Sequence, residues 1–198
     1  MRKRWPRAQG LLTLLVFWCG SAYAHDAFGS GKSVIAGALH LVASPLAVAA
    51  VLGLVLALMG IGESWALKCA GIAGAGTAAA CALPGHFPAF AAPAAVVLVG
   101  LSAAANLKPM GPLAVLLALV AGLAGGIAAD LDTPTWQGIV GAAGTTMLIT
   151  ACALAGLEDL IVWPKLRSAI PIARRVAGSW IAAIGLLLGA LAIRSGAA

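Results

Sequence analysis

The chain has 198 residues, of which 62% are hydrophobic and 9% charged. Soluble domains average roughly 45–50% apolar and about 25% charged residues, so the composition excludes an ordinary soluble domain. The formal net charge of +6 does not indicate a nucleic-acid surface, because a third of the basic residues lie in the first seven positions: Arg2, Lys3, Arg4 and Arg7. The abundance of Ala, Leu, Gly and Val predicts an all-α, polytopic membrane helix bundle with close helix packing.

Residues 1–24 have the three parts of a secretory signal peptide. The basic start is followed by an apolar run from Leu11 to Cys19, which is too short to cross a bilayer, since a spanning helix needs about 20 residues. Small residues at Ala22 and Ala24 then predict cleavage after Ala24. An uncleaved anchor is the alternative interpretation.

Cleavage at this position makes His25 the first residue of the mature chain. An N-terminal histidine can chelate a metal ion through its α-amine and its imidazole together, and the neighbouring Asp26 can add an oxygen ligand. The alternative is that His25 and Asp26 belong to a flexible tail that follows the cleavage site.

Six apolar segments follow, and residues 25–198 are predicted to form a single transmembrane domain. Each segment has nearly the length that spans a bilayer, allowing for tilt. Glycine, proline and polar residues interrupt the apolar pattern between them and are natural helix ends. The segments are 33–60, 64–83, 89–106, 111–129, 136–157 and 172–193.

The distribution of basic residues predicts the orientation. A signal peptide places residue 25 outside, so the first, third and fifth loops face the cytoplasm. These loops and their flanks contain Lys68, Lys108, Lys165, Arg167, Arg174 and Arg175, whereas the outer side contains Lys32 and Arg194. This asymmetry follows the positive-inside rule. We therefore expect a bacterial inner-membrane protein with a periplasmic N-terminus.

Pairs of small residues predict where the helices approach each other. Gly122 and Gly126 lie four residues apart, as do Gly185 and Gly189, and the segment 71–76 is also rich in glycine and alanine. Such spacing places small residues on one helix face and allows close backbone contact.

The motifs of the common enzyme classes are missing from the sequence, which predicts a protein that is not an enzyme. The chain contains no GxSxG, HExxH or Walker sequence, and Gly31-Lys32-Ser33 lacks the spaced glycine of a phosphate-binding loop. The chain contains no CxxC pair, so the sequence indicates neither a zinc site nor a disulfide framework. Three cysteines, Cys69, Cys81 and Cys152, are predicted to be small buried residues within the helices.

Metal binding is the chemistry that the remaining polar residues suggest. His40 lies within the first apolar segment, where an ionisable group is costly and usually faces the bundle interior or a cavity. His86 and the pair Asp130 and Asp132 fall on the same outer side, and imidazole and carboxylate groups can bind divalent cations. The alternatives are a hydrogen-bonded His40, an exposed loop residue at His86, and a helix-capping role for Asp132.

The chain resembles the HupE/UreJ family of hydrogenase and urease accessory membrane proteins. The resemblance rests on Ala24-His25, on Ala36-Gly37-Ala38-Leu39-His40 entering an apolar span through Gly53, and on the segment 175–185. The family motif has a proline after the histidine, followed by an Asp-His pair. This chain has Leu41 after His40, and Leu46 and Ala47 at the positions of that pair.

The resemblance implies an integral membrane protein that acts as a permease for nickel or cobalt, or as an accessory protein of metalloenzyme maturation. It implies no bound cofactor other than the transported ion, and a lipid bilayer as the surroundings. The alternative is a non-transporting membrane scaffold that has lost the metal motif and associates with copies of itself or with a membrane partner.

Overall fold

The computed structural model describes residues 33–83, 85–107, 109–131, 134–161 and 168–196. Every regular element in these residues is a helix, so the all-α prediction is confirmed for the described part of the chain. The predicted signal peptide, residues 1–24, lies outside it. The helices are α3 (Val34–Ala43), α4 (Pro45–Ala57), α5 (Glu63–Ala82), α6 (Ala91–Ala104), α7 (Pro112–Ala129), α8 (Trp136–Ile161) and α9 (Ala169–Gly196).

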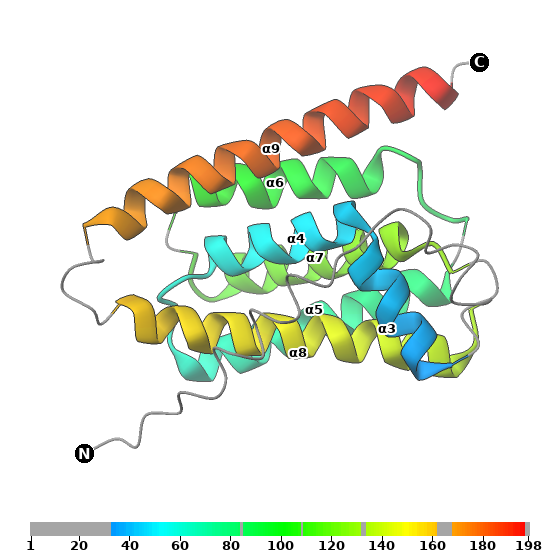
Figure 1. Cartoon of the computed structure of the whole chain (residues 1–198), viewed down its shortest axis with the longest axis horizontal. Coiled ribbons are helices and arrows are strands. Elements are labelled where there is room, and N and C mark those ends of the chain that lie inside the picture. The colour runs from blue at the N-terminus through cyan, green and yellow to red at the C-terminus, as the bar shows by residue number, and fades with distance from the viewer. Residues whose placement is uncertain (1–32, 84, 108, 132–133, 162–167, 197–198) are drawn as a thin grey trace.

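These helices form an elongated bundle in which α4 to α9 run alternately in opposite directions (Figure 1). At one end of the bundle, the ends of α4, α6 and α8 lie with the starts of α5, α7 and α9. We call this the Arg174 end. The opposite end carries α3 and the loops that join α5 to α6 and α7 to α8, and we call it the His40 end (Figure 1).

Each of the six predicted segments is helical, but the prediction of one continuous helix over 33–60 is wrong. The chain breaks at Ser44, and α3 and α4 are bent by 79° from each other. Ser44 is extended, with φ −82° and ψ 111°, and its hydroxyl accepts a hydrogen bond from the Ala47 amide at 3.3 Å. Pro45 explains the break, because proline disfavours a helical conformation in the preceding residue and suits the first position of a new helix.

Among the described residues, three helices are long and apolar enough to cross a membrane: α7, residues 136–158 of α8, and residues 169–194 of α9. The bent pair α3 and α4 meets the same test together and would be a fourth span. Helix α6 is apolar but has 14 residues, and α5 contains both Glu63 and Lys68. The structure therefore supports a membrane protein with three or four spans, while six crossings remain a prediction.

Glycines at the predicted positions bring the helix backbones together. A Cβ atom added to Gly122 of α7 would lie 2.1 Å from the Ala73 oxygen of α5, and one added to Gly126 would lie 2.5 Å from the Thr77 oxygen. At Gly185 of α9 the distance to the Pro93 oxygen would be 2.9 Å. The prediction is weaker at Gly189, where a Cβ would make only an ordinary contact at 3.4 Å.

A small polar bridge crosses the apolar core between α5, α7 and α8. The hydroxyl of Thr77 lies 3.0 Å from the Gly122 oxygen and 3.1 Å from the Thr146 hydroxyl, and both threonines are fully buried. One turn further along α8, the buried Thr150 hydroxyl has no hydrogen-bond partner within the described residues. The bridge links three helices by hydrogen bonds, in addition to the van der Waals packing between them.

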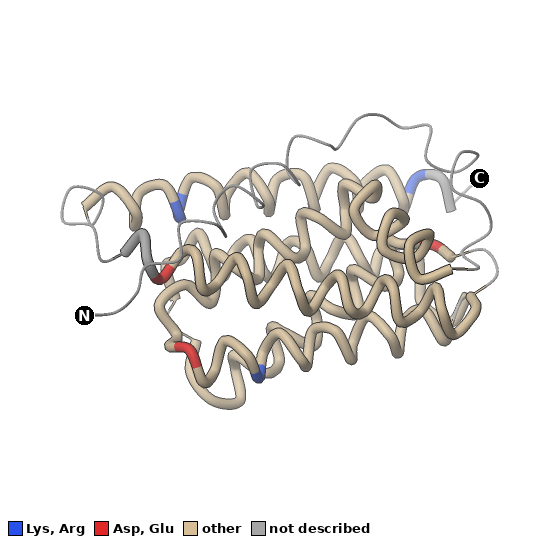
Figure 2. Tube along the Cα trace, turned by 60° about the horizontal axis from the view of Figure 1, so that its bottom comes forward, with Lys and Arg blue, Asp and Glu red and all other residues tan. Residues whose placement is uncertain are grey.

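The described Lys, Arg, Asp and Glu residues lie towards the two ends of the bundle, and its central part carries none (Figure 2). An uncharged middle is what the hydrocarbon layer of a bilayer requires, because a charge there is costly. Two of the three predicted buried cysteines, Cys69 and Cys81, are buried, whereas Cys152 is exposed on α8. That error arises because a residue in an apolar helix can face lipid as well as the protein interior.

Candidate functional site

His40 lies in the last turn of α3 and is 8% exposed. Its backbone oxygen accepts a hydrogen bond from the Ser44 amide at 3.2 Å, which closes α3 at the break. Because α3 is turned by 79° from α4, it lies across the end of the bundle rather than along it (Figure 1). His40 is therefore a buried histidine beside the break between α3 and α4.

The position of α3 is fixed by backbone contact with α8. A Cβ atom added to Gly37 would lie 2.0 Å from the Gly138 oxygen, and one added to Gly141 would lie 2.0 Å from the Val34 oxygen. No side chain fits between the two helices at either point. The glycines therefore set the distance between α3 and α8 and, with it, the position of the His40 backbone.

Two other predicted ligands lie in loops at the His40 end. His86 is exposed between α5 and α6, and its amide donates to the Leu83 oxygen at 3.4 Å. Asp130 is exposed and ends α7 in the left-handed conformation, with φ 42°. Both side chains are accessible to solvent or to an ion, in contrast to the buried His40.

The three described ligand candidates share one end of the molecule without converging. Within the described ranges, no group of three or more His, Cys, Asp or Glu residues could hold a metal ion together. His25, Asp26 and Asp132 lie outside the described residues, so the full predicted set is untested. The described residues supply one buried imidazole and two exposed groups, which lie in separate loops.

The opposite end of the bundle contains a buried arginine. Arg174, in the second turn of α9, is 5% exposed. Its Nη2 donates to the oxygen of Ala57, the last residue of α4, at 2.8 Å, and also to the oxygen of Leu107, just beyond α6. A positive charge at helix C-termini is favourable, because the unpaired carbonyl groups there carry partial negative charge. Arg174 therefore joins α9 to the ends of α4 and α6.

Two further polar contacts lie at the Arg174 end. In the structure, a carboxylate oxygen of Glu158 accepts a hydrogen bond from the Gly62 amide at 3.1 Å. The ammonium group of Lys68 lies 4.9 Å from the centre of the Trp65 ring. The first contact joins the end of α8 to the start of α5, and the second lies within α5.

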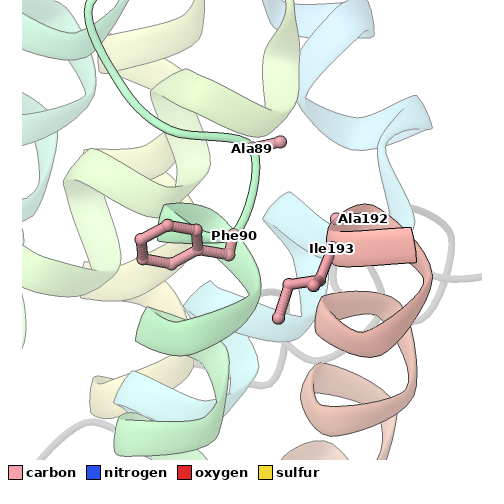
Figure 3. Close-up of a pocket in the computed structure, with 4 residues that line it drawn as sticks. All are labelled: Ala89, Phe90, Ala192 and Ile193. Carbon is pink, nitrogen blue, oxygen red and sulfur yellow. The ribbon is translucent and has the colours of Figure 1, made fainter. Parts of the chain in front are cut away.

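Two surface cavities lie at opposite ends of the bundle. The first, of about 430 Å³, opens between the start of α6 and the end of α9, and Phe90 and Ile193 come from the two sides (Figure 3). Its lining residues are all apolar, so their side chains offer no metal ligand. The second, of about 440 Å³, contains Arg174 in its wall. Neither cavity is lined by His40, His86 or Asp130.

No protein-family model, characterised protein or solved structure matches this chain.

Two features of these ends were not predicted from the sequence: the break at Ser44 and the burial of Arg174. The pair Ser44-Pro45 could have predicted the break, because a serine followed by a proline is a common helix start. The burial of Arg174 had no such signal, since Arg174 and Arg175 are adjacent and chemically identical. Only the packing of α9 against α4 and α6 buries the first of these two arginines and leaves the second exposed.

Proposed function

We propose that this chain is a membrane permease for a divalent metal ion, nickel or cobalt, or an accessory protein that supplies such an ion to a metalloenzyme. The HupE/UreJ resemblance suggests the ion. The observation that carries the proposal is the burial of His40 one turn before the break between α3 and α4. Neutral imidazole is a common ligand for nickel and cobalt.

The broken helix supports this proposal independently of the resemblance. Transporters commonly place their ion and substrate sites at discontinuous membrane helices, where backbone groups are released from helical hydrogen bonds. Here the break lies in an apolar pair of helices, and Ser44 brings both a hydroxyl and an extended backbone to it. A buried histidine beside such a break is suited to a step at which an ion leaves water.

The exposed candidates suggest how an ion would reach His40. Asp130 and His86 lie in loops at the same end, and His25, Asp26 and Asp132 belong to the same predicted outer side. Carboxylates attract divalent cations from solution, while a buried imidazole is the more selective ligand. We propose that the exposed groups collect the ion and that His40 binds it afterwards.

The proposed topology has six spans, with the His40 end facing the periplasm of a bacterial inner membrane. The Arg174 end carries Lys68, Arg174 and Arg175, and the His40 end carries Arg194 among the described basic residues. Alkaline phosphatase fused after Ser168 should be inactive, because that loop would be cytoplasmic. The same enzyme fused after Ala89 should be active. The opposite pattern would exclude a periplasmic ion entry at His40.

Metal accumulation in cells tests the role of His40. We expect His40→Ala to lower nickel or cobalt uptake to the level of cells without the protein. Leu41→Ala is the matched control, because it weakens the packing of the same helix but keeps the imidazole. Unchanged uptake in His40→Ala at equal protein level would remove His40 from the mechanism.

A membrane scaffold is the second candidate, and one surface of α9 favours it. This surface is an apolar stripe of side chains that are 42–69% exposed: Val176, Trp180, Ile184, Leu187 and Leu191. Lipid can cover this stripe, but so can a helix of a partner protein. A partner that co-purifies without metal, and is lost in Trp180→Ala/Leu187→Ala, would favour the scaffold if metal uptake were also independent of His40.

A further inference from the structure

The cavity at the Arg174 end has a composition that differs from the rest of the bundle. It has a volume of about 440 Å³ and lies between the loop after α4, the loop after α6 and the start of α9. Ile61, Met110 and Pro171 provide apolar walls, and Asn106 and Arg174 provide polar groups. It therefore combines a cationic group with apolar surface at a position where a bundle end meets water.

The guanidinium in this cavity is only partly satisfied. An arginine side chain has five N–H donors, and the two hydrogen bonds that the structure shows for Arg174 both come from Nη2. Its Nε is buried and has no acceptor within the described residues. An unpaired donor of a buried charged group is unfavourable, because it has lost water without gaining a partner.

The two carbonyl oxygens offset the charge of Arg174 only in part. The end of a helix carries about half a negative charge, and of the two acceptors only Ala57 belongs to a helix end, since α6 stops at Ala104. No described carboxylate forms an ion pair with Arg174, because its described acceptors are backbone oxygens. The site thus has a positive charge that its described acceptors offset only in part, and a guanidinium whose donors are not all paired within the described residues.

We propose that this cavity binds a phosphate group, with one of its oxygens accepting a hydrogen bond from the guanidinium group of Arg174. Arginine is well suited to phosphate because its donors are fixed in a plane and its charge does not depend on pH. The phosphate can belong to an anionic phospholipid headgroup or be free in solution. Basic cavities between membrane helices bind such headgroups, and the apolar walls suit the adjoining part of a lipid. The site lies at the opposite end from His40 and goes beyond the proposed metal transport.

Native mass spectrometry of the purified full-length protein tests this site. Phosphatidylglycerol, phosphatidylcholine and inorganic phosphate are titrated separately, and phosphate is also added as a competitor of phosphatidylglycerol. The variants are Arg174→Gln, which removes the donor, and Met110→Trp, which fills the mouth of the cavity at a residue that is 77% exposed. Arg175→Gln is the matched control, because it removes the neighbouring exposed charge.

We expect phosphatidylglycerol to bind at least about tenfold more tightly than phosphatidylcholine, as one charged hydrogen bond would give. Arg174→Gln and Met110→Trp should each abolish this preference, and Arg175→Gln should keep it. Competition by inorganic phosphate would assign the site to free phosphate, and its failure to compete would assign it to the lipid.

The absence of any preference for phosphatidylglycerol, together with no phosphate binding, would overturn the proposal. Equal losses in Arg174→Gln and Arg175→Gln would overturn it as well, since they would indicate a diffuse surface charge. If Arg174→Gln does not fold, Met110→Trp decides, because an unchanged preference in that variant excludes the cavity.

Discussion

The two ends of the bundle are held together by different means. At the His40 end, α3 lies against α8 through glycines that leave no room for a side chain. At the Arg174 end, a single long side chain joins the start of α9 to the ends of α4 and α6. Backbone contact fixes a helix at one distance, whereas a side-chain contact spans a gap and can leave a cavity beside it.

This difference matters for what each end can bind. The close contact between α3 and α8 holds the His40 backbone in one place, as an ion site with defined geometry requires. The arginine at the other end leaves a cavity of about 440 Å³ and a donor that has no acceptor among the residues that the structure describes. This difference is the basis for proposing a small ion at the His40 end and a larger anion at the Arg174 end.

The largest loss of stability is expected when a side chain is placed between α3 and α8. Gly141→Val should lower the free energy of unfolding by about 3 kcal/mol, because overpacking a closed contact forces the backbones apart. Gly144→Ala is the control on the same helix, since an added Cβ there meets nothing within 4 Å. Denaturant titration in detergent micelles measures both. Equal stability of the two variants would show that α3 is not held by this contact.

Substitutions at the Arg174 end should lower the free energy of unfolding less, because side chains and water can rearrange there. Arg174→Met removes two charge-assisted hydrogen bonds but keeps an apolar stem, so we expect a loss of about 2 kcal/mol. Arg175→Met should change the stability by less than about 0.5 kcal/mol, as is usual for surface positions. If the two substitutions have the same effect in the same titration, the arginine does not join α9 to α4 and α6.

The polar bridge between the two ends should have a smaller effect. Thr77→Val removes the hydroxyl that contacts Gly122 and Thr146, and interhelical hydrogen bonds in membranes contribute about 1 kcal/mol. Ser179→Ala is the control, because its hydroxyl bonds only to the Arg175 oxygen of its own helix, at 2.9 Å. In detergent, Thr77→Val should therefore unfold at a clearly lower temperature than Ser179→Ala. A loss no larger than that of Ser179→Ala would contradict the bridge.

The order and bounds of the helices could be predicted because apolar runs and turn residues alternate clearly. The predicted segment 111–129 differs by one residue from α7, and 64–83 is shifted by one from α5. The number of spans could not be settled in this way, because α5 is built largely from Ala and Gly and carries Lys68. Such a helix is suited to close packing in the interior as much as to a lipid surface.

The candidate site was harder to predict than the helices. His40 could be singled out because a histidine in an apolar segment is rare and costly. Its neighbours in space could not, because the bend at Ser44 redirects α3 and helix neighbours do not follow from segment lengths. Arg174 lay among the residues that gave the orientation, and its burial depends on contacts with Ala57 and Leu107, distant in sequence.

The smallest expected effect concerns the break that separates α3 from α4. Ser44→Ala removes the hydroxyl that accepts the Ala47 amide, and the loss of such a cap costs between about 0.5 and 1 kcal/mol. The bend itself should persist, because Pro45 still prevents the preceding residue from becoming helical and the glycine contacts still hold α3 on α8. Hydrogen exchange at the Ala47 amide should accelerate, while exchange within α8 stays unchanged. Ser64→Ala, at an exposed serine in the first turn of α5, is the control. If exchange also accelerated across the first turns of α8, the cap and the glycine contacts would have to act together in positioning His40.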